Sequence, residues 1–154
     1  MPDDLYERDA LAWSEQQADL LRRLARGERV NDVDWEHVVE EIEDVGRSEL
    51  HAVESFLELI FVHLLKLHRW PDSHARRHWQ SEIRAFQTRA GRRFSPSMRQ
   101  KIDLAGIYRG ALGQTDVSEF DGNTGMAAPE ACPVTLDQLL HSDVAELDAA
   151  FAAA

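Results

Sequence analysis

The chain has 154 residues and a single cysteine, so a disulfide within the chain is excluded. Its apolar share of 44% is ordinary for a globular protein, and its length suits one domain. The most apolar stretch, residues 56–67, is interrupted by polar side chains and is shorter than the ~20 apolar residues of a membrane span. The N-terminal residues have neither the basic nor the apolar region of a signal peptide. We therefore expect one soluble cytoplasmic domain over residues 1–154.

The net charge of −11 is unevenly distributed. Residues 1–62 carry a net charge of −11, residues 63–110 carry +8, and residues 111–154 carry −8. The whole molecule should be repelled by nucleic acids and anionic membranes, and we expect it to bind neither. The basic middle segment either packs between acidic neighbours or presents a face to an acidic protein partner. The arginines of that partner face would be Arg76, Arg77, Arg84 and Arg89.

The first half of the chain shows helical periodicity throughout. A first helix is predicted over residues 4–26, and Gly27 is placed to end it. A second helix begins near Asp32 or Asp34 and ends or bends at Gly46. Apolar residues at i, i+3, i+4, i+7 and i+10 predict that one of its faces is buried. These residues are Trp35, Val38, Val39, Ile42 and Val45.

A third helix, residues 48–68, is apolar nearly all round and should be central. With the second helix it is predicted to form an antiparallel hairpin over residues 34–69. Trp70-Pro71 then ends the helical pattern, because proline disfavours the helical state of the residue before it.

A fourth helix is expected over residues 73–89 and a fifth over residues 96–113, where Ser95-Pro96 is a start signal. Residues 114–134 are predicted to be loop-rich. A capping box at Thr135 precedes a short helix, and a last helix reaches Phe151. The predicted fold class is therefore all-α. It is a compact helical bundle of about five main helices on the hairpin, with a short C-terminal helix or two.

The hairpin would bring acidic side chains of the second helix beside polar side chains of the third. His63 and Lys66 interrupt an apolar run, and an unpaired buried charge is strongly disfavoured, so both need partners. The polar cluster predicted across the hairpin comprises Glu40, Glu43, Arg47, Glu54, His63 and Lys66. This cluster is either structural or a working site.

Helical bundles build metal sites from inward-facing carboxylates and imidazoles. The residues available for such a site are Glu40, Glu43, Glu54 and His63. The spacing of His and Glu in this part of the chain is His-x-x-Glu and not the Glu-x-x-His of di-iron bundles. We therefore expect no metal and no cofactor. Metal binding by these residues is the alternative hypothesis. His74 and His78 share a helix face, but the neighbouring arginines disfavour a cation there. Cys132 is interpreted as a small, semi-buried residue without a catalytic role.

Several short motifs are shared with a known family. They are Asp34-Trp35-Glu36, the acidic run of residues 40–49 containing Gly46-Arg47-Ser48-Glu49, His63-Leu64-Leu65-Lys66, Cys132-Pro133 and Thr135-Leu136-x-Gln138-Leu139-Leu140. Over about residues 5–142 the chain resembles the bacterial family called domain of unknown function 29. It departs from that pattern at Val134, where the family usually has tyrosine. The resemblance implies a bacterial, cytoplasmic, helical domain and supplies no catalytic residues.

The sequence contains no glycine-rich phosphate loop and no Ser/His/Asp signature. We therefore interpret the chain as a non-enzymatic interaction or regulatory module that binds a protein partner or a second copy of itself. The alternative is a metal-binding or hydrolase-like bundle that uses the Glu/His cluster.

Overall fold

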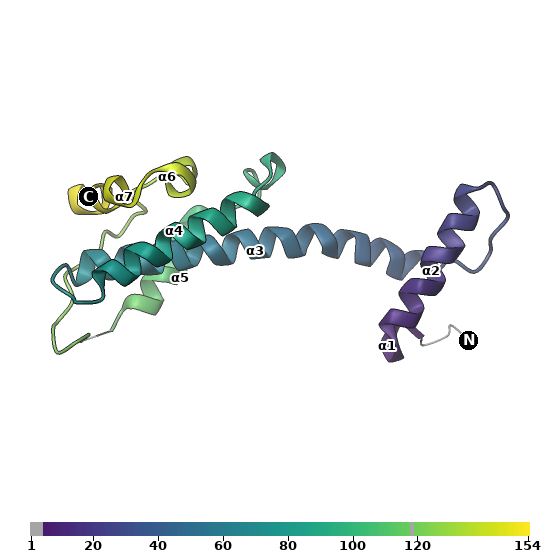
Figure 1. Cartoon of the computed structure of the whole chain (residues 1–154), viewed down its shortest axis with the longest axis horizontal. Coiled ribbons are helices and arrows are strands. Elements are labelled where there is room, and N and C mark those ends of the chain that lie inside the picture. Colours follow the sequence, from purple (N-terminus) through teal and green to yellow (C-terminus); the bar gives the residue numbers. More distant parts are fainter. Residues whose placement is uncertain (1–4, 118) are drawn as a thin grey trace. The chain divides into compact units, whose positions relative to one another are not determined.

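A computed structural model describes residues 5–117 and 119–154 of the chain (Figure 1). In this part of the chain the regular structure is helical, and no strand longer than an isolated bridge is present, which confirms the all-α prediction. The elements are α1 (Leu5–Arg8), α2 (Ala10–Ala25), α3 (Trp35–Arg69), α4 (Arg76–Arg93), the 3-10 helix η1 (Pro96–Met98), α5 (Leu104–Thr115), α6 (Leu136–His141) and α7 (Val144–Ala153). Within the described ranges, no helix has both the length and the apolar character needed to cross a membrane.

The chain divides into two compact units, Met1–Ser48 and Glu49–Ala154, and helix α3 contributes residues to both. The prediction that residues 1–154 form a single domain stays a prediction. Each unit is described here by itself.

The predicted antiparallel hairpin over residues 34–69 is wrong, because these residues form one uninterrupted helix of 35 residues (Figure 1). A glycine inside a helix costs only about 1 kcal/mol relative to alanine, so Gly46 alone cannot end α3. Arg47 also bridges this position: its Nε lies 2.7 Å from Asp44 Oδ1 and its Nη1 lies 3.5 Å from Glu43 Oε2. Such pairs at i, i+3 and i, i+4 stabilise a continuous helix.

The first predicted helix is divided into α1 and α2 at Asp9. Its predicted start, Asp4, lies outside the described residues. Asp9 leaves the helical conformation, with φ at −152°, and its carboxylate accepts a hydrogen bond from Ala12 N at 3.0 Å. It therefore acts as the N-cap of α2. At the other end of α2, Gly27 adopts a positive φ of 85°, as the sequence predicted for a helix stop.

The first unit has a very small apolar core. Its buried apolar residues within the described range are Trp13, Leu20 and Val38. Polar contacts add to the core: Trp13 Nε1 donates to Asp34 Oδ2 at 3.0 Å, and Asp34 N donates to Gln17 Oε1 at 2.8 Å. These bonds connect α2 to the first turn of α3.

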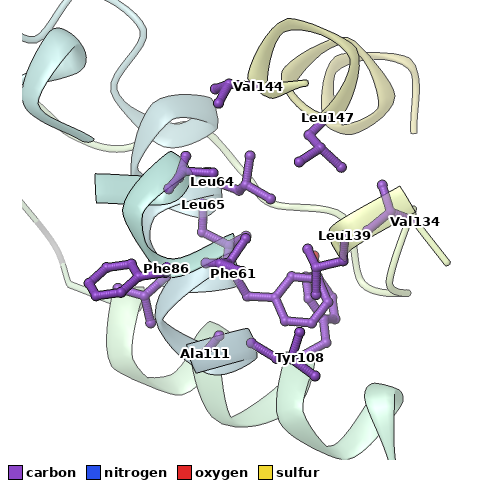
Figure 2. Close-up of a cluster of buried hydrophobic side chains, with 14 of the residues drawn as sticks. Phe61, Leu64, Leu65, Phe86, Tyr108, Ala111, Val134, Leu139, Val144 and Leu147 are labelled. Atoms are coloured by element: carbon purple, nitrogen blue, oxygen red, sulfur yellow. The ribbon is translucent and has the colours of Figure 1, made fainter. Parts of the chain in front are cut away.

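The second unit holds the main hydrophobic core, which Figure 2 shows in part. The C-terminal part of α3 is central to it, as predicted for residues 48–68, and Leu57, Phe61 and Leu64 are fully buried. Helices α4, α5, α6 and α7 contribute further buried side chains. These include Ile83, Phe86, Tyr108, Leu139, Leu147 and Phe151.

The predicted fifth helix, residues 96–113, is divided into η1 and α5. Asp103 separates them, because its carboxylate accepts a hydrogen bond from Gly106 N at 3.0 Å and so caps α5. The capping box of Thr135 and Gln138 at the start of α6 is present as predicted.

The predicted loop over residues 114–134 begins within the last turn of α5, and its described residues contain no further helix. Several hydrogen bonds attach this loop to the helices and to Trp70. Trp70 Nε1 donates to Asn123 O at 3.0 Å, Met126 N to Arg69 O at 2.8 Å, and Tyr108 Oη to Pro129 O at 2.6 Å.

Candidate functional site

The six residues of the predicted polar cluster do not come together. Glu40, Glu43 and Arg47 belong to the first unit, whereas Glu54, His63 and Lys66 belong to the second. All six lie on one helix, and Glu40 and Lys66 are about seven turns apart along it. Helix α3 therefore contains no hairpin across which they could meet.

The acidic group around Arg47 makes only local pairs along α3. Arg47 bonds to Asp44 and Glu43, and all three side chains are about half exposed. Pairs of this kind contribute about 0.3–0.5 kcal/mol each in helices. The pair between Glu43 and Arg47 forms within one helix and stabilises that helix.

His63 and Lys66 do not need the carboxylates that the sequence argument assigned to them. His63 Nδ1 donates to the backbone oxygen of Leu59 at 2.7 Å, and its ring centroid lies 5.4 Å from that of Phe86. Lys66 Nζ lies 5.9 Å from the centre of the Trp79 ring, within the range of a cation–π contact. A backbone carbonyl and an aromatic ring therefore take the place of the expected ion pairs.

The burial of His63 predicts a pH dependence of stability. Burial lowers the pKa of His63 below its ordinary value of 6.5, so the unfolded chain binds the proton at a higher pH than the folded chain. The free energy of unfolding is therefore expected to fall as the pH falls through 6.5 toward the folded pKa. Urea unfolding at pH 7.5 and 5.5 measures this difference, which should be smaller in His63→Gln. An equal pH difference in the variant would contradict the prediction.

The alternative of a metal-binding bundle finds no support in the structure. Within residues 5–117 and 119–154, no three His, Cys, Asp or Glu side chains lie close enough together to hold a metal ion. His74 and His78 are exposed near the start of α4. Glu54 and His63 are separated by two and a half turns of α3, so they do not form half of a ligand set.

Cys132 has the environment of an unreactive thiol. It is half-buried, its Sγ lies 3.2 Å from the Val134 oxygen, and burial raises the pKa of the thiol. We expect the native protein to react with an aromatic disulfide reagent at least about tenfold more slowly than the urea-unfolded chain, because the thiolate is the reactive form. Equal rates for the two states, followed by absorbance, would contradict this prediction.

The four arginines of the predicted partner face differ in their surroundings. Arg76 is bound on both sides, with Nη2 3.1 Å from Asp148 Oδ2 and Nη1 2.9 Å from Leu67 O. Arg77, Arg84 and Arg89 are exposed on α4, and Arg89 lies over the ring of Phe86. Arg76 therefore has a structural role within the second unit, and the other three are available to solvent.

The first unit carries an exposed apolar surface that was not predicted from the sequence. Of the face predicted to be buried, only Val38 is buried. The other four members are exposed, and we call them the α3 stripe: Trp35, Val39, Ile42 and Val45. The apolar periodicity of these residues is visible in the sequence, but in the predicted hairpin this face would have packed against the third helix of the same chain.

His37 and Asp34 form the best-defined polar pair of the first unit. His37 Nδ1 donates to Asp34 Oδ2 at 2.7 Å, and the His37 ring stacks on Tyr6 at 3.9 Å between centroids. The hydrogen bond from His37 to Asp34 raises the pKa of His37. Burial alone would raise the pKa of Asp34, but the hydrogen bonds from His37 and Trp13 outweigh it and lower that pKa. This arrangement holds the start of α3 against α1 and α2.

These features define a class: an all-α protein whose described residues contain no group of His, Cys, Asp and Glu side chains that could hold a metal ion, and which has an exposed apolar helix face. The chain belongs to the family described as "Domain of unknown function DUF29", whose profile matches residues 5–145. It is similar to the crystal structure of an α-helical protein of unknown function from Rhodospirillum rubrum. The two chains are 33% identical with a TM-score of 0.70, and the match covers 96% of each. No curated protein matches the chain.

Proposed function

We propose that this chain is a non-enzymatic protein-interaction module of the cytoplasm and that it binds a helix of a partner protein through the α3 stripe. The observation that carries the proposal is the exposure of this stripe. The exposed fractions of Trp35, Val39, Ile42 and Val45 are 56%, 51%, 66% and 68%. The single free thiol, Cys132, suits the reducing conditions of that compartment.

The exposed apolar residues are concentrated in one unit. Six of the eight large hydrophobic side chains that are exposed in the described residues belong to Met1–Ser48. The same unit buries only three apolar side chains within its described range. A unit of this size has little core of its own, and a contiguous exposed apolar surface is typical of an interaction site. We infer that a partner completes the core of this unit.

The spacing of the stripe selects the shape of the partner. Its residues follow one another at intervals of four, three and three along α3. Such a row covers one side of a helix and packs well against a second helix, whose side chains enter the spaces between the rows. A partner helix with its own apolar stripe therefore fits this surface.

The charge beside the stripe selects the chemistry of the partner. The intervening positions of α3 carry acidic side chains, namely Glu36, Glu40, Glu41, Glu43 and Asp44. Residues 1–48 together hold 14 acidic and six basic residues, a net charge of −8. Two copies of this surface would bring like charges together, whereas a helix with Lys or Arg beside its apolar stripe would gain attraction. We therefore assign the surface to a basic amphipathic helix of another protein.

A designed peptide tests the proposal directly. The probe is a 21-residue amphipathic helix with a leucine stripe flanked by lysines, and its binding is measured by calorimetry. The double variant Val39→Glu/Ile42→Glu is expected to bind the probe about tenfold or more weakly than the wild-type chain, since it places charges in the apolar contact. Both positions are exposed, so the variant should keep its helical circular dichroism.

The matched control is Leu11→Glu. Leu11 is 70% exposed in the same unit but belongs to α2 and not to the stripe, so its replacement should leave probe binding unchanged. A second probe with glutamates in place of the lysines should not bind. The proposal is overturned if the stripe variant and the control bind equally well. It is also overturned if light scattering shows a dimer of the wild-type chain that the stripe variant abolishes, because a second copy would then occupy the surface.

A further inference from the structure

A basic hollow of about 520 Å³ lies on the second unit beside helices α4 and α6. Two arginines of α4 contribute the positive charge, and a histidine at the end of α6 also lines the hollow. Its polar and backbone lining includes Arg84, Gln87, Thr88, Gly91, Arg92 and His141. The proposed protein-interaction surface involves none of these residues, so the two sites are independent.

The fold holds the two sides of the hollow together through Gln87. The side-chain amide of Gln87 donates to Leu139 O at 3.0 Å and to Ser142 O at 2.9 Å. These oxygens belong to the C-terminal end of α6, so the bonds place His141 next to α4. Gly91 has no side chain, and no heavy atom lies within 4 Å of the position that a Cβ would take. The space at Gly91 therefore remains open.

The arginines of this hollow have no acidic partner in the described residues, a property that they share with Arg77 and Arg89 on the same helix. Three arginines on α4 and just after η1 are paired with carboxylates. These pairs are Arg76 with Asp148, Arg93 with Glu49, and Arg99 with Asp137. Arg84 and Arg92 have no ion pair within residues 5–117 and 119–154.

The lining residues of the hollow include no Asp or Glu. In a chain with 28 acidic and 17 basic residues, a hollow lined only by basic and neutral side chains runs against the average charge. Two unpaired guanidinium groups that face one open space are the arrangement that oxyanion recognition requires.

We infer that this hollow binds a small oxyanion ligand that carries at least two negative charges on phosphate or carboxylate groups. Arg84 and Arg92 are eight residues apart on α4, which corresponds to a rise of about 12 Å along the helix. Their guanidinium groups can therefore contact two separate anionic groups of one ligand, or both can extend toward the centre of the ligand. His141 supplies a further nitrogen from the opposite side. The volume of the hollow, about 520 Å³, suits a small ligand.

Thermal unfolding of the full chain tests this inference with three probes: sodium pyrophosphate, sodium phosphate and sodium citrate. Sodium chloride at equal ionic strength serves as the reference. We expect a probe that binds the folded chain to raise the Tm in a concentration-dependent way. A rise with pyrophosphate alone assigns phosphate chemistry, a rise with citrate alone assigns carboxylate chemistry, and a rise with both assigns a general site for multivalent oxyanions. Inorganic phosphate should bind more weakly than pyrophosphate, because it offers one group instead of two.

Two double variants locate the site. Arg84→Gln/Arg92→Gln is expected to bind about tenfold or more weakly than the wild-type chain, since it removes both charge-assisted contacts. The control Arg77→Gln/Arg89→Gln removes the same charge from the same helix but outside the hollow. It should change the affinity by less than about twofold, because only long-range electrostatic attraction is lost. Gly91→Glu, which adds a carboxylate where the space is open, should weaken binding as the first variant does.

Three results would overturn the inference. The first is the absence of any Tm rise beyond that of sodium chloride. The second is an equal loss of affinity in the two double variants, which would indicate a diffuse charge effect. The third is unchanged affinity in Gly91→Glu. Arg84 and Arg92 are exposed, so the variants are expected to remain folded. Circular dichroism of each variant checks this.

Discussion

Leu64→Ala is expected to lower the free energy of unfolding by about 2–5 kcal/mol, whereas Ile42→Ala on the same helix should change it by less than about 0.5 kcal/mol. Leu64 is fully buried in the core of the second unit, and its truncation would leave a cavity there (Figure 2). Ile42 is 66% exposed and has no such cavity to leave. Urea unfolding of the two variants, followed by circular dichroism, measures the difference.

This comparison distinguishes the observed helix from the predicted hairpin. In the hairpin both residues would face the same interior, and both variants would lose several kcal/mol. Val45→Ala offers a matched control for Ile42→Ala, because Val45 is 68% exposed on the same stripe. A large loss of stability in Ile42→Ala, at a protein concentration where the chain is monomeric, would contradict the structure of the first unit.

Gly46→Pro is expected to destabilise helix α3 by about 3 kcal/mol, while Gly46→Ala should stabilise it by about 1 kcal/mol. Gly46 lies inside α3, where proline would remove the hydrogen bond to the Ile42 oxygen and its ring would clash with that carbonyl group. Alanine meets no heavy atom within 4 Å at this position. Backbone hydrogen exchange of residues 39–50 and helical circular dichroism provide the measurement.

A helix break at Gly46 would reverse the sign for alanine. A glycine at the end of a helix favours a left-handed conformation, so alanine would destabilise that end. Proline, whose φ is fixed near −65°, would destabilise it as well, so the alanine variant is the one that separates the two structures. Gly27, which ends α2 with a φ of 85°, serves as the internal comparison. Gly27→Ala should destabilise the chain where Gly46→Ala stabilises it.

Local signals predicted the parts of the fold that depend on a few neighbouring residues. Thr135 and Gln138 form the expected capping box, Gly27 ends a helix, and α3 ends just before Trp70-Pro71. In each case the conformation of one turn is decided by side chains within four positions of it. The central place of the C-terminal part of α3 also followed from its composition, since a helix that is apolar nearly all round has to be enclosed.

The packing of residues that are far apart in the sequence could not be predicted from these local patterns. The apolar period of Trp35, Val39 and Ile42 indicates that one face prefers contact with apolar atoms, but it does not say whether those atoms belong to the same chain. Gly46 was interpreted as a break, although a helix tolerates one glycine when the surrounding pairs favour it. The predicted polar cluster depended on that break, and α3 does not contain it.

The basic hollow could not be derived from sequence for a different reason. Arg84 and Arg92 are visible as part of a basic helix, but their lack of acidic partners depends on where each carboxylate of the unit lies. His141 is 49 residues beyond Arg92 and reaches the hollow only because Gln87 binds the end of α6. A pattern of charges along the chain does not contain that information.

Trp70 connects the end of α3 to a segment more than fifty residues later in the chain. Its indole is 4% exposed, donates to Asn123 O, and lies against Gly125, where a Cβ would approach Trp70 Cζ2 to 2.9 Å. The ordering of this segment and the integrity of the helix end are therefore thermodynamically linked. In a variant with Trp13, Trp35 and Trp79 replaced by phenylalanine, the fluorescence of this indole should consequently shift to longer wavelength whenever the segment detaches, even while the rest of the second unit stays folded.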